Sequence, residues 1–157
     1  MSDLGPVTKS IVVNAGADAA FDHFTAQIGQ WWPLATHCRS AGVHGAPAKT
    51  CLMEGKVGGR VYEVAPTGEE YLWGTVLAWE PGARVVWSWH LGRPAEEATE
   101  IEVTFTDAGV GKTRVDLEHR NWDRLADDAA EARGSYNGGW DVVFTERYGG
   151  FVAAAAA

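Results

Sequence analysis

The sequence predicts an α+β domain in which about seven antiparallel strands form a curved sheet around one long C-terminal helix. Residues 58–90 contain three strand-rich runs separated by two turns, Pro66-Thr67-Gly68 and Glu80-Pro81-Gly82, which is the pattern of an antiparallel meander. From Asp123 onward the apolar residues instead recur with a period near 3.6, as in an amphipathic helix. The apolar stripe of the helix and the concave face of the sheet can cover each other, so this packing follows from the order of the elements.

The elements before the meander are a strand and short helical turns. Residues 7–13 are β-rich, and residues 15–28 carry the apolar stripe of a short helix that Gly29 is expected to end. Trp31-Trp32-Pro33 then stops or bends the chain, because proline restricts its own backbone and that of the residue before it. Two adjacent tryptophans cannot face the same way, so we expect one to anchor the core and the other to line an opening. Residues 34–49 lack a period and are predicted to form a loop, and long loops in compact domains are disproportionately functional.

Strands at residues 50–54, 98–106 and 113–120 complete the predicted sheet, and a hairpin turn joins the last two. Alternate residues of a strand point to opposite faces, and this phase directs His119 toward the core at the end of its strand. In the third run of the meander the same alternation places three large apolar side chains on one face: Val85, Trp87 and Trp89.

The last predicted element is a long amphipathic helix over residues 125–152. Gly134, Gly138 and Gly139 each lower its intrinsic stability by up to ~1 kcal/mol, so packing against the sheet must hold it in place. Its apolar stripe consists of Tyr136, Trp140, Val143, Phe144 and Phe151.

Composition and charge limit the class of protein. The 157 residues, 46% hydrophobic and 22% charged, suit one globular domain over residues 1–157, with disordered or frayed ends expected at about 1–6 and 153–157. The net charge of −8 and the scattered cations argue against nucleic acid and an anionic membrane surface as partners. No apolar run approaches the ~18 residues of a membrane helix, so the expected location is the cytoplasm. Cys38 and Cys51 have no metal-ligand or redox spacing and are expected to be free thiols.

Several short motifs stand in a recognisable order along the chain: Trp31-Trp32-Pro33, Gly58-Gly59, Gly74-x-Val76, Pro81, Trp89, Thr113, His119 and Gly139-Trp140. With this order the chain resembles the START-like (SRPBCC, Bet v 1-like) superfamily from about Ser10 to Val152. More narrowly it resembles the bacterial branch homologous to the C-terminal domain of the activator of heat-shock protein 90 ATPase. The resemblance implies a helix-grip fold with a cavity between the sheet and the C-terminal helix that often holds a small hydrophobic molecule. A contact with a chaperone is implied by the resemblance alone.

The candidate ligand-binding residues are mostly aromatic. Bulky aromatics on inward phases either fill a core or line a cavity, and the sequence leaves both readings open. The set consists of Trp32, Trp73, Trp87, Trp89, Trp140 and Phe144.

Three polar residues complete the candidate site. His119 is either an acid–base or hydrogen-bonding group at the cavity mouth, or a core histidine satisfied by a backbone carbonyl. The strand alternation does not fix the direction of Glu63: it shares a face with Val61, which would point it inward, but Tyr62 and Val64 could form the inward face instead. Facing inward it would have a raised pKa and suit general acid–base chemistry, and facing outward it would be solvated or paired with Arg60, the reading that we favour. His37 shares its loop with His44, but no third ligand stands at metal spacing, so neither a metal nor another cofactor is expected.

The leading hypothesis is a domain that binds a small hydrophobic or aromatic molecule without catalysis, so no catalytic residue is assigned. The first alternative is a cyclase- or hydrolase-like enzyme that uses His119 with Glu63 or His37 in the same cavity. The second alternative is a protein-interaction module like the co-chaperone domain, in which the surface matters rather than the cavity. A roomy apolar cavity would favour the first hypothesis and a collapsed core the last. The sequence leaves a homodimer open.

Overall fold

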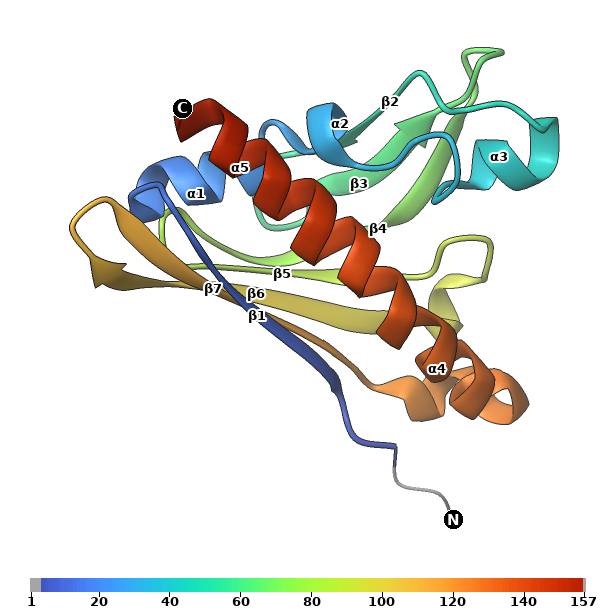
Figure 1. Ribbon diagram of the computed structural model, residues 1–157. Coiled ribbons are helices and arrows are strands. Elements are labelled where there is room, and N and C mark those ends of the chain that lie inside the picture. The colour runs from blue at the N-terminus through green and yellow to red at the C-terminus, as the bar shows by residue number, and fades with distance from the viewer. Residues whose placement is uncertain (1–3, 157) are drawn as a thin grey trace.

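One antiparallel sheet of seven strands runs through the computed structural model, which describes residues 4–156 (Figure 1). The strand order is β1-β7-β6-β5-β4-β3-β2, so β1 alone is out of sequence order and pairs with β7, with Val7 opposite His119. The predicted number of strands and their antiparallel pairing are confirmed. The strands are β1 (Val7–Val13), β2 (Thr50–Met53), β3 (Arg60–Val64), β4 (Glu70–Glu80), β5 (Arg84–Trp89), β6 (Thr99–Gly109) and β7 (Lys112–Arg120).

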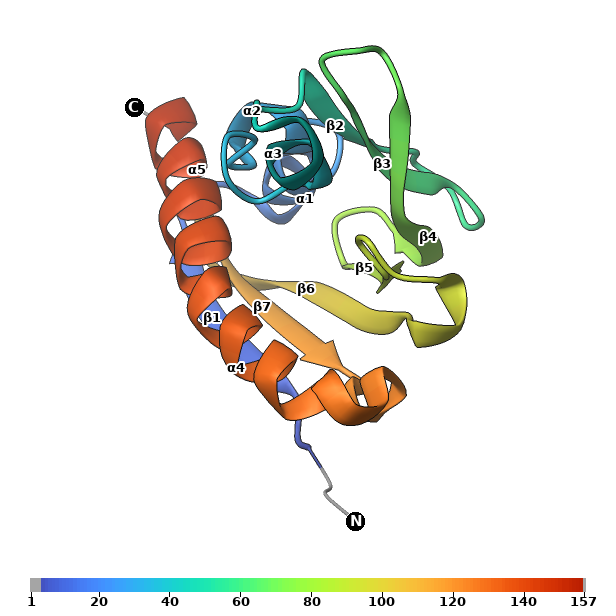
Figure 2. The same ribbon diagram turned by 90° about the vertical axis from the view of Figure 1, so that its right-hand side faces the viewer.

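The long C-terminal helix lies across the concave face of this sheet, as predicted. It begins as a 3₁₀ turn (η2, Trp122–Asp128) and continues as α4 (Ala129–Trp140), a π-helical stretch (η3, Asp141–Tyr148) and α5 (Gly149–Ala156). Figure 2 shows the sheet curving away from this helix, from β1 beside it to β2 on the far side. The short helices α1 (Ala17–Phe24), α2 (Ile28–Trp31) and α3 (Arg39–His44) lie inside that curve. A single 3₁₀ turn, η1 (Ala95–Glu97), joins β5 to β6.

The turns of the meander have the geometry that their residues predict. Gly68 and Gly82 adopt φ angles of 92° and 76°, which favour glycine. At Gly82 a Cβ would also lie 2.3 Å from Asp18 Oδ1, so another residue there would displace that carboxylate as well as strain the turn between β4 and β5.

Two details of the predicted helices are wrong. The helix expected over residues 15–28 is divided into α1 and α2, and Gly29 lies inside α2 rather than ending a helix. A Cβ at Gly29 would lie 2.4 Å from Thr50 Oγ1 and 2.8 Å from the carbonyl oxygen of Cys51. Glycine therefore serves the close packing of α2 on β2.

The predicted loop at 34–49 contains a short helix, α3. Cys38 caps its N-terminus, with Sγ accepting a hydrogen bond from the Ala41 N–H, and Gly45 ends it at a φ of 65°. The Arg39 and Ser40 N–H groups at its start donate to the carboxylate of Glu63 in β3. A tertiary contact thus stabilises a helix that has no periodic pattern of its own.

The core forms where β5 faces the C-terminal helix. Val85, Trp87 and Phe144 are fully buried, and Phe24 of α1 lies between the last two, 5.8 Å from Trp87 and 6.4 Å from Phe144 in ring centroids. The strand and helix stripes are both buried, as predicted, and they meet directly at Trp89 and Trp140, 6.5 Å apart in ring centroids, whereas Phe24 separates Trp87 from Phe144.

The chain ends differ from each other. Residues 4–6 have no regular structure, residues 153–156 belong to α5, and the remaining residues of the expected frayed ends, 1–3 and 157, lie outside the described residues. No helix within residues 4–156 combines the length and the apolar composition needed to cross a membrane.

Candidate functional site

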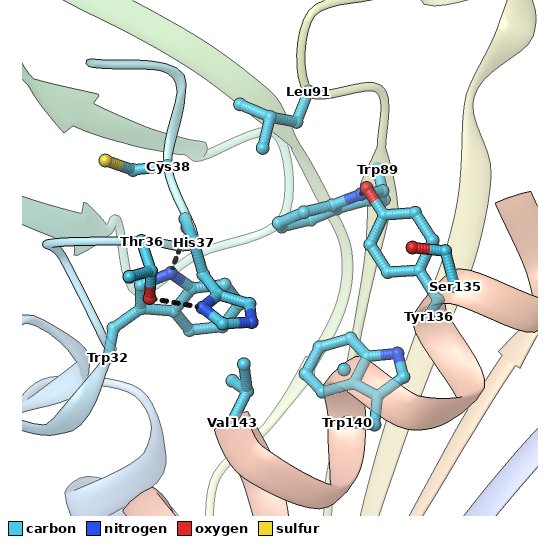
Figure 3. A pocket seen from close by; sticks show the side chains of 11 residues that line it. Trp32, Thr36, His37, Cys38, Trp89, Leu91, Ser135, Tyr136, Trp140 and Val143 are labelled. Carbon is cyan, nitrogen blue, oxygen red and sulfur yellow. Dashed lines mark hydrogen bonds between the residues drawn. The ribbon is translucent and has the colours of Figure 1, made fainter. Parts of the chain in front are cut away.

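A cavity of about 250 Å³ opens between β5, the first half of the C-terminal helix and the segment 32–38 (Figure 3). Its lining residues are Trp32, Thr36, His37, Cys38, Trp89, Leu91, Ser135, Tyr136, Gly139, Trp140 and Val143.

Three indole rings from three different elements form the main walls. The ring centroids of Trp32, Trp89 and Trp140 lie 5.8 to 6.5 Å apart. Each indole N–H is already bound by the protein: Trp32 Nε1 donates to the His37 carbonyl oxygen at 2.6 Å, and Trp89 Nε1 donates to the Tyr136 hydroxyl at 2.8 Å. Trp140 Nε1 donates to His119 Nδ1 at 3.0 Å. The walls therefore offer ring faces and edges rather than free donors to an occupant.

His119 fixes the Trp140 wall. Its side chain is fully buried, and because an indole N–H can only donate, Nδ1 must be unprotonated and Nε2 must carry the proton. Nε2 then donates to Thr99 Oγ1 at 2.7 Å, and the Thr99 hydroxyl donates to the carbonyl oxygen of Trp89 at 3.2 Å. Burial lowers the pKa of this imidazole to about 3. The group is a neutral link between two cavity walls, and neither ring nitrogen is free for acid–base chemistry.

Both readings of His119 need correction. It does not line the cavity, and its ring is satisfied by a hydroxyl and an indole rather than by a backbone carbonyl. Its own carbonyl oxygen accepts from Trp122 Nε1 at 2.9 Å, so the residue also holds the start of the C-terminal helix.

Glu63 faces inward, so the favoured solvated or Arg60-paired reading is wrong. Its side chain is fully buried and accepts from Arg39 N (2.6 Å), Ser40 N (2.9 Å), Ser40 Oγ (2.5 Å) and Trp73 Nε1 (2.8 Å). Arg60 instead pairs with Glu54 and Glu70 on the surface. Burial alone would raise the pKa of the Glu63 carboxyl, but the hydrogen bonds outweigh burial and hold the pKa below its ordinary value.

The raised pKa expected for an inward Glu63 is therefore also wrong. The carboxylate does not line the cavity, and it anchors α3 and Trp73 to β3. Together with His119 it belongs to the framework of the site.

His37 is the histidine that faces the cavity. Its half-buried ring projects inward from the segment before α3, with Nδ1 2.7 Å from Thr36 Oγ1 (Figure 3). Desolvation lowers the pKa of the imidazole, so the ring is neutral at neutral pH and can accept a proton or a hydrogen bond.

The family model described as "Activator of Hsp90 ATPase homolog 1-like protein" matches residues 14–147 of the chain. The chain belongs to this family. The resemblance inferred from the motif order is thus confirmed over most of the chain.

Solved structures show the same fold as this Activator of Hsp90 ATPase homolog 1-like chain. The anthrahydroquino-γ-pyrone synthase Txn09, solved in complex with SUM, is 29% identical over 96% of this chain and 99% of that chain, with a TM-score of 0.62. CalC from Micromonospora echinospora, described as a self-sacrificing resistance protein, is 26% identical over 98% and 97% of the two chains, with a TM-score of 0.71. A search of curated proteins finds no match.

The structure brings four of the predicted site residues to the cavity of this family member: Trp32, His37, Trp89 and Trp140. The other five lie around it. Trp73 forms a layer behind the walls, 4.9 Å from Trp32 and 5.4 Å from Trp89 in ring centroids. The remaining four are core or framework residues: Glu63, Trp87, His119 and Phe144.

Sequence reasoning missed several lining residues. Tyr136 and Val143 stand on the predicted helix stripe, so their inward direction was visible but not their place at a cavity. Leu91 and Cys38 come from connections whose paths the sequence did not predict. The other missed residues are Thr36, Ser135 and Gly139.

Within residues 4–156, no three His, Cys, Asp or Glu side chains gather as a metal site requires. Cys38 and Cys51 are both buried and unbridged, and burial raises the pKa of the Cys51 thiol. The Cys51 thiol therefore lacks the lowered pKa that marks a reactive cysteine.

Proposed function

We propose that this chain binds a small aromatic molecule in the cavity between β5 and the C-terminal helix. The observation that carries the proposal is the set of three indoles, Trp32, Trp89 and Trp140, which contact one another and form a continuous aromatic wall of an open space of about 250 Å³. Flat aromatic surfaces with bound N–H groups suit an occupant that stacks or packs edge to face. An open, apolar-walled cavity also favours ligand binding over the interaction-module alternative.

The size and polarity of the cavity limit the ligand. Ligand pockets usually measure ~300–1,000 Å³, so about 250 Å³ suits one or two fused rings. The His37 and Ser135 side chains line the cavity and hold none of the three indoles in place. They are therefore suited to form a hydrogen bond with one hydroxyl or carbonyl group of the ligand. With burial and one or two hydrogen bonds available, we expect broad selectivity and micromolar affinity, roughly −8 kcal/mol.

Similarity to Txn09 supports the aromatic character of the ligand, and the small cavity of this chain sets its number of rings. That protein is named for an anthrahydroquino-γ-pyrone, a fused aromatic system, and it is 29% identical to this chain over nearly the whole length of both.

Filling the cavity from the helix side tests the proposal. A Cβ at Gly139 or at Gly138 would meet nothing within 4 Å, but only Gly139 lines the cavity. Gly139→Leu should therefore abolish saturable quenching of tryptophan fluorescence by β-naphthol, while the matched Gly138→Leu variant should bind as the wild type does. Equal binding by both variants would place the ligand elsewhere. The absence of any saturable response in the wild type, with β-naphthol and with other fused aromatics, would refute the proposed function.

A second candidate function is catalysis on the bound molecule, with His37 as the general base. It rests on the neutral His37 ring in the cavity and on the similarity to a synthase. The corresponding reaction is closure of an oxygen ring: His37 takes the phenol proton of an o-hydroxyphenyl β-diketone, the oxygen attacks the distal carbonyl carbon, and loss of water leaves a γ-pyrone.

Ring closure can be followed by absorbance of the γ-pyrone. His37→Gln should remove any acceleration of closure and leave the affinity for the diketone within about twofold, because the walls remain. No acceleration by the wild type over buffer would leave ligand binding without catalysis.

A further inference from the structure

A second, more polar space adjoins the cavity. A groove of about 390 Å³ is lined by Arg39, Tyr71, Gly92 and Arg93 among others. Cys38 and Leu91 line the cavity, and the next residue of each segment, Arg39 and Gly92, lines the groove. The cavity and the groove are therefore neighbours: along the segment 38–39 and along the segment 91–92, one residue lines the cavity and the next lines the groove.

Arg39 lies where the two spaces adjoin. A Cβ placed on Gly92 would lie 2.8 Å from Arg39 Nη1, so the guanidinium reaches from the start of α3 to the β5–β6 connection. Its Cζ lies 5.7 Å from the ring centroid of Tyr71, which holds the guanidinium plane over an aromatic surface. The exposed side chain thus lies against Tyr71 and Gly92 in the groove, one residue along the chain from Cys38 of the cavity wall.

The other charged side chains of the groove are already paired. Arg93 contacts Glu97 at 2.9 Å and Asp128 at 3.3 Å, and Glu70 contacts Arg60 at 2.8 Å. Within the described part of the chain, no carboxylate lies within 4 Å of the Arg39 guanidinium. A protein of net charge −8 therefore presents an uncompensated cation in the groove beside its apolar cavity.

We infer that the ligand of the cavity is an aromatic carboxylic acid, with its ring among the three indoles and its carboxylate on Arg39. The planar guanidinium suits a carboxylate because it can donate two parallel hydrogen bonds, and it is more weakly hydrated than an ammonium group. The inference rests on the proposed function, since it assigns the charge of a ligand that the cavity must first accept.

Two nearly isosteric probes separate charge from ring binding: β-naphthoic acid, which is ionised at about pH 7.5, and neutral β-naphthamide. Their affinities are measured by quenching of tryptophan fluorescence for the wild type, Arg39→Gln and Arg93→Gln. The wild type should bind the acid about tenfold more tightly than the amide, and Arg39→Gln should remove that difference by weakening the acid alone. Arg93→Gln, in the same groove but with its charge already paired, should leave both affinities within about twofold. Raising the salt concentration to about 0.5 M should weaken the acid and not the amide.

The outcomes distinguish this inference from the function on which it rests. If both probes bind equally well, or if Arg39→Gln weakens both to the same extent, Arg39 does not recognise a carboxylate and the cavity still binds aromatics. If neither probe binds the wild type, the proposed function itself is wrong. Circular dichroism melting of each variant shows that the fold is retained, because the Arg39 contact with Glu63 is made by the backbone N–H and survives the substitution.

Discussion

Mild acid should destabilise this fold through His119. The imidazole is fully buried, its Nδ1 accepts from Trp140 and its Nε2 donates to Thr99, so a second ring proton would have no acceptor and would break the bond to Trp140. In the unfolded chain the same ring takes up a proton at its ordinary pKa of 6.5. Lowering the pH therefore reduces the stability of the folded state through His119, the residue that holds Trp140 in the cavity wall.

The magnitude follows from the two pKa values. Burial lowers the pKa of His119 to about 3 in the folded state, so between pH 3 and 6.5 the unfolded state binds the proton and the folded state does not. The stabilisation is complete above pH 6.5 and is lost as the pH falls, by about 1.4 kcal/mol for each pH unit. At about pH 5 the loss is about 2 kcal/mol. Carboxylates held at lowered pKa values, such as Glu63, add their own loss only below about pH 4.5.

Urea unfolding followed by tryptophan fluorescence at about pH 7.5 and pH 5 measures this difference. His119→Gln should be less stable at neutral pH and should lose about 2 kcal/mol less than the wild type on acidification. His44→Gln, which removes an exposed histidine beside Tyr71, is the matched variant against which the loss of the buried His119 is compared. An equal pH dependence in the wild type and His119→Gln would show that His119 takes up a proton in the folded state, and the neutral link to Trp140 would be wrong.

Three other measurements test the framework. Trp140→Ala should cost ~3–5 kcal/mol, because it removes a nearly fully buried indole, and an unchanged melting temperature would contradict that packing. Glu63→Ala leaves the Ser40 and Trp73 donors without their buried acceptor, at ~1–3 kcal/mol for each lost bond, and it should loosen α3; amide exchange at Ser40 as slow as in the wild type would count against this role. Thiol titration under denaturing, non-reducing conditions should return two free thiols, and a count of zero would indicate a disulfide.

Regular periodicity explains what could be predicted from the sequence. Strands with one apolar face and turns built on Pro-Thr-Gly or Glu-Pro-Gly carry their signal in a few neighbouring residues, and all seven strands formed. His119 was correctly placed on an inward phase for the same reason. The helix α3 and the inward direction of Glu63 depend on each other across the fold, so neither has a local signal.

The candidate site was only partly predictable, because strand phase gives the direction of a side chain and not what it meets. Trp87 and Trp89 share one face of β5, two residues apart. Trp87 packs against Phe24 of α1 in the core, while Trp89 packs against Trp140 of the C-terminal helix and lines the cavity. The partners of the two rings come from distant parts of the chain, α1 and the C-terminal helix, so strand phase alone does not separate the two roles.

The hydrogen bonds of the tryptophans show how the cavity stays open. Trp87 Nε1, deep in the core, has no hydrogen-bond partner among the described residues, and dense packing alone holds its ring. The three cavity indoles line an open space, and each is fixed by a hydrogen bond from its N–H. The cavity walls are mostly apolar and open to solvent, so bringing them together would remove apolar surface from water, which favours collapse of the walls. Bonds to His37, Tyr136 and His119 oppose that collapse, so the polar groups around the cavity preserve the space that a ligand would fill.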